Sequence, residues 1–170
     1  MRTLDGTVEQ VLARIATSNK GIASREELLA AGLSRNQIRR RTRKGVLIPE
    51  YPGVYRVGHS APSVQASYLA ALKACGEGAV LSGLAAAYLY ELIKGKPPAP
   101  EVTARTKRKL PGVITHRARA SIEDASEYDG IPVTTMPRTL VDIAPKLEAD
   151  ALARAVHQAA VRFHTKIGRA

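Results

Sequence analysis

The sequence is poor in aromatic residues and in cysteine. It has no tryptophan, one phenylalanine and six tyrosines among 170 residues, so a core must be built mainly from alanine, leucine, valine and isoleucine. The single cysteine, Cys75, excludes an internal disulfide; we expect it to be packed, with a reactive thiol as the less favoured alternative. No apolar run reaches the roughly 20 residues that cross a bilayer, and the polar first residues lack the apolar stretch of a signal peptide. We therefore expect a cytoplasmic protein.

Acidic residues are scarce relative to basic ones. The chain has 26 Lys and Arg against 15 Asp and Glu, a formal net charge of +11. Residues 1–58 carry a net +6, residues 94–119 carry +7, and the remaining stretches together carry −2. Such an excess favours a polyanionic partner, which is a nucleic acid, an acidic protein or a membrane surface. A hydrophobic fraction of 45% is typical of folded domains, and the length allows one compact domain or two small ones.

Residues with catalytic or metal-binding chemistry are few and scattered. The four histidines show no ligand spacing, and His157 and His164, which share a helical face, lack further ligands. There is no Gly-rich phosphate loop. The one carboxylate cluster, within Glu123–Asp129, lies at a predicted hairpin without a lysine arranged for nuclease chemistry. We expect no active site, no metal and no cofactor, and hence a function that is not enzymatic.

The first 59 residues predict a winged helix-turn-helix domain. Apolar residues at helical spacing indicate a helix over Val8–Ser18. Two Ser-x-x-Glu/Gln capping boxes, Ser24–Glu27 and Ser34–Gln37, open two further helices on either side of a turn at Gly32. Short extended runs at 46–48 and 54–57, joined by a Pro- and Gly-rich turn, then predict the hairpin that forms the wing.

The third helix is the predicted DNA-reading element. Residues 35–44 hold six cations, while Ile38 and Thr42 form the buried edge. A solvated basic face is the alternative, which the capped pair and the wing disfavour. Because Arg and Asn read bases from the start of such helices, we assign Arg39 and Asn36 to bases and Arg43 and Lys44 to the backbone. The predicted DNA-binding residues are Ser34, Arg35, Asn36, Arg39, Arg40, Arg43, Lys44, Tyr55 and Arg56.

For the wing tyrosine in that set, Tyr55, packing against the helices is the favoured alternative. Arg56 beside it is expected to contact phosphate or the minor groove. After a linker, residues 64–170 predict a small α+β domain. Its pattern is helix, short strand, helix, four strands and two helices, with a hairpin turn at Asp129–Gly130. The predicted fold class is therefore α+β, with the winged helix-turn-helix followed by an antiparallel sheet covered by helices.

A second basic segment lies within this C-terminal domain. We predict that it makes either a second contact with the DNA backbone or a docking face for an acidic partner, with a solvated loop as the alternative. Its cations are Arg105, Lys107, Arg108, Lys109, Arg117 and Arg119.

The order of these motifs resembles the AbiEi-type antitoxins of type IV toxin–antitoxin systems. The resemblance covers about residues 20–160. It rests on residues 21–24, 28–34, 38–41, 45–47, 53–55, 57–59, 71–72, 75–82, 129–135 and 137–142. It implies a winged helix that binds the operator of its own operon and represses transcription. It also implies a C-terminal domain that counters a nucleotidyltransferase-like toxin. Many related chains continue into a nuclease-like domain, so a sequence ending at Ala170 is expected to be a short form.

Three functions follow from these observations. The first is a sequence-specific repressor that also acts as a type IV antitoxin. The second is a solitary transcriptional regulator without a toxin. The third is an interaction protein whose basic face over residues 94–119 binds an acidic partner.

Overall fold

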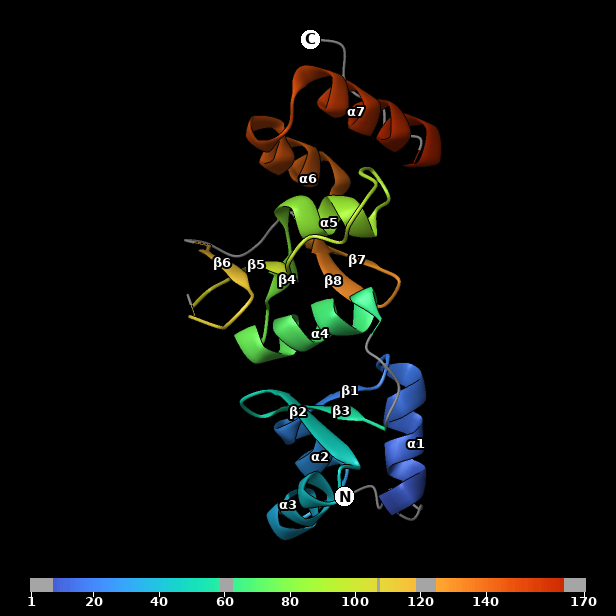
Figure 1. The fold of residues 1–170 in the computed structure, drawn as a ribbon, viewed down its shortest axis with the longest axis vertical. Helices are drawn as coiled ribbons and strands as arrows, with labels where there is room; N and C mark the ends of the chain where they lie inside the picture. The colour runs from blue at the N-terminus through green and yellow to red at the C-terminus, as the bar shows by residue number, and fades with distance from the viewer. Residues whose placement is uncertain (1–7, 59–62, 107, 119–124, 164–170) are drawn as a thin grey trace. The chain divides into compact units, whose positions relative to one another are not determined.

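The computed structural model describes residues 8–58, 63–106, 108–118 and 125–163 (Figure 1). The chain divides into two compact units, residues 1–77 and 78–170. The elements of the first unit are α1 Val8–Ser18, β1 Ile22–Ser24, α2 Arg25–Ala30, α3 Arg35–Arg43, β2 Leu47–Tyr51, β3 Val54–Val57 and α4 Val64–Cys75. Those of the second are β4 Val80–Leu81, α5 Gly83–Leu89, β5 Glu101–Ala104, β6 Ile114–Arg117, β7 Ala125–Tyr128, β8 Ile131–Thr134, α6 Met136–Ile143, the 3₁₀ turn η1 Ala144–Lys146 and α7 Ala149–Phe163.

The N-terminal unit contains the predicted winged helix-turn-helix. Three helices accompany a three-stranded antiparallel sheet of order β1-β3-β2, in which β1 lies between α1 and α2 in the chain and β2 and β3 form the wing. Side chains from α1, the two helices of the motif and the wing meet in one apolar cluster. Its buried members are Val11, Leu12, Ala23, Leu28, Leu33, Ile38, Leu47 and Tyr55.

Two details of this sheet differ from the sequence prediction. Strand β1 was not predicted, because three residues before a capping box carry no periodic signal, and its partner β3 lies far along the chain. Strand β2 continues through Pro49 to Tyr51, where only a turn was expected. Proline is tolerated there because β2 is an edge strand, and the register shifts between Pro49 and Tyr51.

Helix α4 lies in the N-terminal unit. It packs on β1, β2 and β3, and an ion pair between Lys73 and Glu27 joins it to α2. The structural division therefore falls after Glu77, whereas the predicted second domain begins at Val64, directly after the linker.

The C-terminal unit is α+β, as predicted, but its sheet is mixed. The strand order is β6-β5-β4-β8-β7. Pairs β4–β5 and β7–β8 are antiparallel, whereas β4–β8 and β5–β6 are parallel. The prediction of an antiparallel sheet is wrong for the parallel pairs. It holds for β7–β8, where Asp129–Gly130 makes the expected hairpin, but loop 105–113 returns the chain so that β6 runs beside β5 in the same direction.

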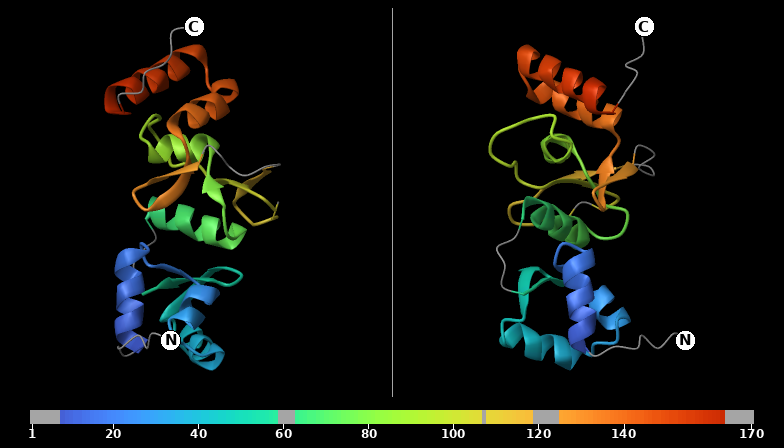
Figure 2. Two further views of the ribbon diagram at one scale, coloured as in Figure 1. Left: turned by 180° about the vertical axis from the view of Figure 1, so that it is seen from behind. Right: turned by 90° about the vertical axis from the view of Figure 1, so that its right-hand side faces the viewer.

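The helices of this unit form successive layers, with α5 next to the sheet, then α6 and then α7 (Figures 1 and 2). Helix α5 contacts β5 and α6, and α6 contacts α7. Large side chains of the sheet and of α6, among them Leu81, Val102, Ile131 and Ile143, are fully buried. Rings of Tyr90, Tyr128 and Phe163 gather from three elements, with centroids 5.0 to 5.9 Å apart. These contacts hold the end of α7 against the hairpin.

Candidate nucleic-acid interface

The angle between α2 and α3 is set by local sequence. Ser24 accepts from the amide of Glu27 at 3.1 Å, and Ser34 accepts from the amide of Gln37 at 3.2 Å. The side chains of Glu27 and Gln37 return a bond to the Ser24 and Ser34 amides, so both predicted capping boxes form. Gly32 adopts φ of +92°, which a larger residue rarely adopts, and Leu33 after it is 2% exposed. These features fix the orientation of α3 relative to α2.

Helix α3 presents a row of polar and cationic side chains to solvent. Arg35, Asn36, Arg39 and Arg40 near its start and Arg43 and Lys44 at its end are exposed, as is the capping Ser34. Ile38 faces the core. Arg39 Nη2 donates to Asn36 Oδ1 over 3.2 Å, so the two side chains assigned to bases are joined before any ligand is present. Together these residues can offer guanidinium and amide groups to an edge of a base pair.

Arg41, which the sequence grouped with the other cations of α3, belongs to the core. It is 8% exposed, and its Nη2 donates to Glu9 Oε1 of α1 over 2.7 Å. That hydrogen bond is the main reason why the pKa of Glu9 lies below its ordinary value. Arg41 therefore fastens α3 to α1 and presents little surface to DNA.

The two wing residues predicted to bind DNA are both engaged within the protein. Tyr55 is 7% exposed in the apolar cluster, and its hydroxyl accepts from Arg25 Nη2 over 3.1 Å. Arg56 Nε donates to Glu50 Oε1 over 2.6 Å, across the wing. Packing, the alternative given for Tyr55, describes its place in the structure, and the charge of Arg56 is balanced by Glu50.

Arg25 is a basic residue that sequence reasoning missed. It is the first residue of α2 and is exposed, and the hydrogen bond to Tyr55 raises its pKa above the ordinary arginine value. The capping box at Ser24 is visible in the sequence, and it already predicts that Arg25 is the first residue of this helix. Its place at the start of the first helix of the motif makes it a further candidate for contact with a phosphate.

The second basic segment brings its described cations to the surface beside β6. Arg105, Arg108, Lys109 and Arg117 are exposed. Arg117 pairs with Ala104 in the register of β5 and β6, which places it next to Arg105. Lys107 and Arg119 lie outside the described residues.

Glu101, the lone acidic residue of that segment, is a buried charge in the C-terminal unit. Its Oε1 accepts from His116 Nε2 at 2.8 Å and from Lys146, and its Oε2 accepts from the Leu84 amide at 3.1 Å. Burial by itself raises the pKa of Glu101, but the hydrogen bonds from Lys146, His116 and Leu84 outweigh it and hold the pKa below its ordinary value. All three partners are protein groups, so we interpret the site as a structural junction between β5, β6, α5 and η1.

Metal-binding clusters and membrane-spanning helices are both absent from the described residues. No group of three or more His, Cys, Asp or Glu side chains is arranged to hold a metal ion there. No helix in those ranges is long and apolar enough to cross a membrane.

Comparisons with known proteins give a family match within the N-terminal unit. No curated protein matches the chain. A crystal structure of the RV2827C protein from Mycobacterium tuberculosis is similar at 17% identity with a TM-score of 0.47, over 88% of this chain and 71% of that one. The family described as "Transcriptional regulator, AbiEi antitoxin" matches residues 10–58. This range runs from α1 to the end of the wing, and over it the resemblance to the AbiEi antitoxin family of transcriptional regulators is confirmed.

Proposed function

We propose that this chain is a non-enzymatic, sequence-specific repressor of the cytoplasm that binds double-stranded DNA at the operator of its own operon. The observation that carries the proposal is the exposed row of cations and Asn36 on α3, the second helix of a capped helix-turn-helix. The family match over residues 10–58 supports a regulatory role. Burial of Ile38 and Leu33 beneath the row gives the helix a fixed orientation.

Within α3 we assign two tasks. Arg39 and Asn36, linked by their hydrogen bond, read base edges in the major groove, with Ser34, Arg35 and Arg40 beside them. Arg43 and Lys44 at the end of the helix hold the phosphate backbone, and Arg25 at the start of α2 adds a further phosphate contact. Tyr55 and Arg56 are left out, because one is buried and the other is paired with Glu50.

The test is a binding series on the DNA upstream of the gene and on random DNA of equal length. Loss of one good bidentate contact costs about 1–3 kcal/mol, so Arg39→Ala or Asn36→Ala should weaken operator binding roughly 5- to 150-fold and random DNA far less. Because the two side chains contact each other, their effects should not add in the double variant. Lys44→Ala should weaken both DNAs alike and lower the salt slope by about one.

Arg14→Ala, which removes an exposed cation of α1, serves as the matched control for loss of charge. Fluorescence anisotropy over a range of salt concentrations gives both affinity and slope. If Arg39→Ala bound both the operator and random DNA as tightly as wild type does, the assignment of Arg39 to base reading would be wrong.

We further propose that the chain acts as a type IV antitoxin, which the family name supports. The test is growth of cells that express a nucleotidyltransferase-like toxin encoded beside this gene, with and without the chain. Rescue supports the antitoxin role, and operator binding without rescue supports a solitary regulator. In the interaction-protein alternative, the exposed side chains of Arg105, Lys109 and Arg117 belong to a basic face that binds an acidic partner, and their joint replacement by glutamine abolishes capture of that partner but not operator binding.

A further inference from the structure

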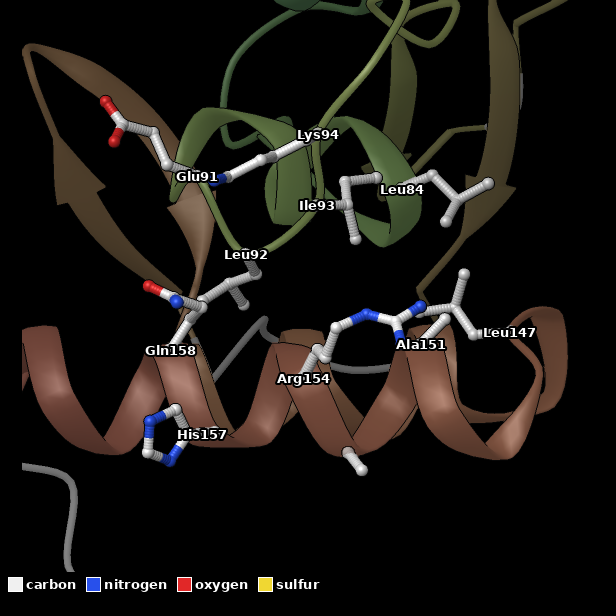
Figure 3. A pocket seen from close by; sticks show the side chains of 11 residues that line it. Leu84, Glu91, Leu92, Ile93, Lys94, Leu147, Ala151, Arg154, His157 and Gln158 are labelled. Atoms are coloured by element: carbon white, nitrogen blue, oxygen red, sulfur yellow. The ribbon is translucent and has the colours of Figure 1, made fainter.

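A groove of about 770 Å³ runs between α7 and the end of α5 with the segment that follows it. Figure 3 shows α7 as one wall and the turn through residues 91–94 as the other. Its volume lies within the range of about 300–1,000 Å³ that small-molecule sites occupy. The groove belongs wholly to the C-terminal unit and shares no residue with α3.

The inner surface of the groove is largely apolar. Leu92 is buried and Ala153 is exposed, whereas the other apolar side chains of the lining are partly buried and offer part of their surface to the groove. The apolar lining comes from both walls and from the turn before α7: Leu84, Leu92, Ile93, Leu147, Ala151 and Ala153. An apolar ligand body would find contacts on two sides here.

The charges at this groove are mainly positive. Lys94 and Arg154 stand on opposite walls, and Figure 3 shows the Arg154 side chain lying along the groove below Leu84 and Ile93. Both are exposed, and within the described ranges neither has an ion-pair or hydrogen-bond partner. The acidic residue of the lining, Glu91, is paired with Arg162 and so does not neutralise them. His157 and Gln158 add polar atoms from α7.

We propose that this groove binds a small amphipathic anion, with an apolar body between the two walls and a carboxylate held by Arg154, while Lys94 adds positive charge on the opposite wall. Two unpartnered cations beside an apolar surface complement such a ligand in both charge and polarity. The distance along α7 from Ala151 to Gln158 is about 10 Å at the helical rise of 1.5 Å per residue. This length suits a medium-chain acyl carboxylate.

The test uses decanoate as the probe, with hexanoate and decyltrimethylammonium for comparison, titrated calorimetrically into the full chain. We expect one saturable decanoate site per chain, with hexanoate at least tenfold weaker because it lacks methylene groups to bury. The decyl cation, which has the same chain and the opposite charge, should not compete. Arg154→Gln with Lys94→Gln should weaken decanoate at least tenfold and remove the preference for the anion.

Two further variants test whether a loss of decanoate binding is specific to the groove or follows from the general loss of charge or from misfolding. Arg105→Gln with Lys109→Gln removes the same charge from exposed residues outside the groove and should bind decanoate as wild type does. Ala151→Trp fills the groove and should abolish binding while circular dichroism and DNA affinity stay unchanged.

Several results would overturn the proposal. The first is the absence of a saturable decanoate site. The second is decanoate binding that survives in the Arg154→Gln, Lys94→Gln double variant and also in Ala151→Trp. The third is a loss of decanoate binding in the Arg105→Gln, Lys109→Gln variant as large as that in the Arg154→Gln, Lys94→Gln variant. Binding of an acidic amphipathic peptide without binding of decanoate would also overturn it, and would identify a protein as the occupant.

Discussion

Replacing Glu101 by glutamine tests whether the buried carboxylate stabilises the C-terminal unit. The side chain is 4% exposed, and the substitution keeps its shape but removes its charge. A hydrogen bond to a charged group contributes about 1.5–3 kcal/mol, and those from Lys146 and His116 would be lost or weakened. Both partners are partly exposed, at 36% and 50% of their side chains, so they can turn to water.

We therefore expect Glu101→Gln to lower the free energy of unfolding by about 2 kcal/mol, because the Leu84 amide keeps an acceptor. Glu101→Ala, which leaves that amide, Lys146 and His116 without their partner, should cost about 3–5 kcal/mol. Urea unfolding of the full chain, followed by circular dichroism at pH 7, measures both. The matched control is Glu127→Gln on β7, an exposed carboxylate, for which we expect a change within about 0.5 kcal/mol.

The pH dependence provides a second check on the same substitution. Since the pKa of Glu101 is lowered in the folded protein, its stabilisation is fully present above the unfolded value of about 4.3. It is lost as the pH falls through the lower folded value. The difference between wild type and Glu101→Gln should thus be present at pH 5 and shrink as the pH falls below about 4. A variant as stable as wild type at pH 7, or a difference that does not shrink below pH 4, would refute the stabilising role.

Two further substitutions test the packing that surrounds these sites. Gly83→Ala should lower the unfolding free energy by about 2 kcal/mol, because a Cβ there would lie 2.2 Å from Glu101 Oε2 and the backbone φ is +55°; a urea curve like that of wild type would contradict this. Arg41→Met should leave stability unchanged or slightly raised, since it removes a buried guanidinium whose Nη1 has no hydrogen-bond partner among the described residues, while the Glu9 side chain is mostly exposed to water. In DNA-binding assays Arg41→Met should act less than Arg43→Met, which removes an exposed charge of the same helix, and an equal effect would place Arg41 in the interface.

The N-terminal unit could be predicted largely from local sequence. The helix over Val8–Ser18 has the bounds that its apolar stripe predicts, and both capping boxes form as their spacing requires. Such features depend on residues within four positions of one another, so one sequence suffices. Strand β1 depends instead on pairing with β3, and no local pattern indicates that partner.

The limits of sequence reasoning are clearest at charged residues. Arg41 is one of six cations in residues 35–44 and lies on a flank of the helical projection, but no local pattern indicates that it meets Glu9, which lies 32 residues earlier. Glu101 was counted as one acid within a basic stretch, yet its partners His116 and Lys146 arrive from later elements. Composition and periodicity do not report such distant pairings. These pairings nevertheless decide which cations remain available to a ligand.

The outer strands of the C-terminal sheet bear on how the protein avoids aggregation. Strands β6 and β7 lie at its two edges, and each has only four residues. Exposed edges can pair with other chains, and short length and charged side chains are the usual protection. Arg117 on β6 and Glu127 on β7 are exposed at these edges, so two copies approaching through the same edge meet like charges. The basic character of β6 therefore helps to keep separate copies from joining their sheets, whatever else it binds.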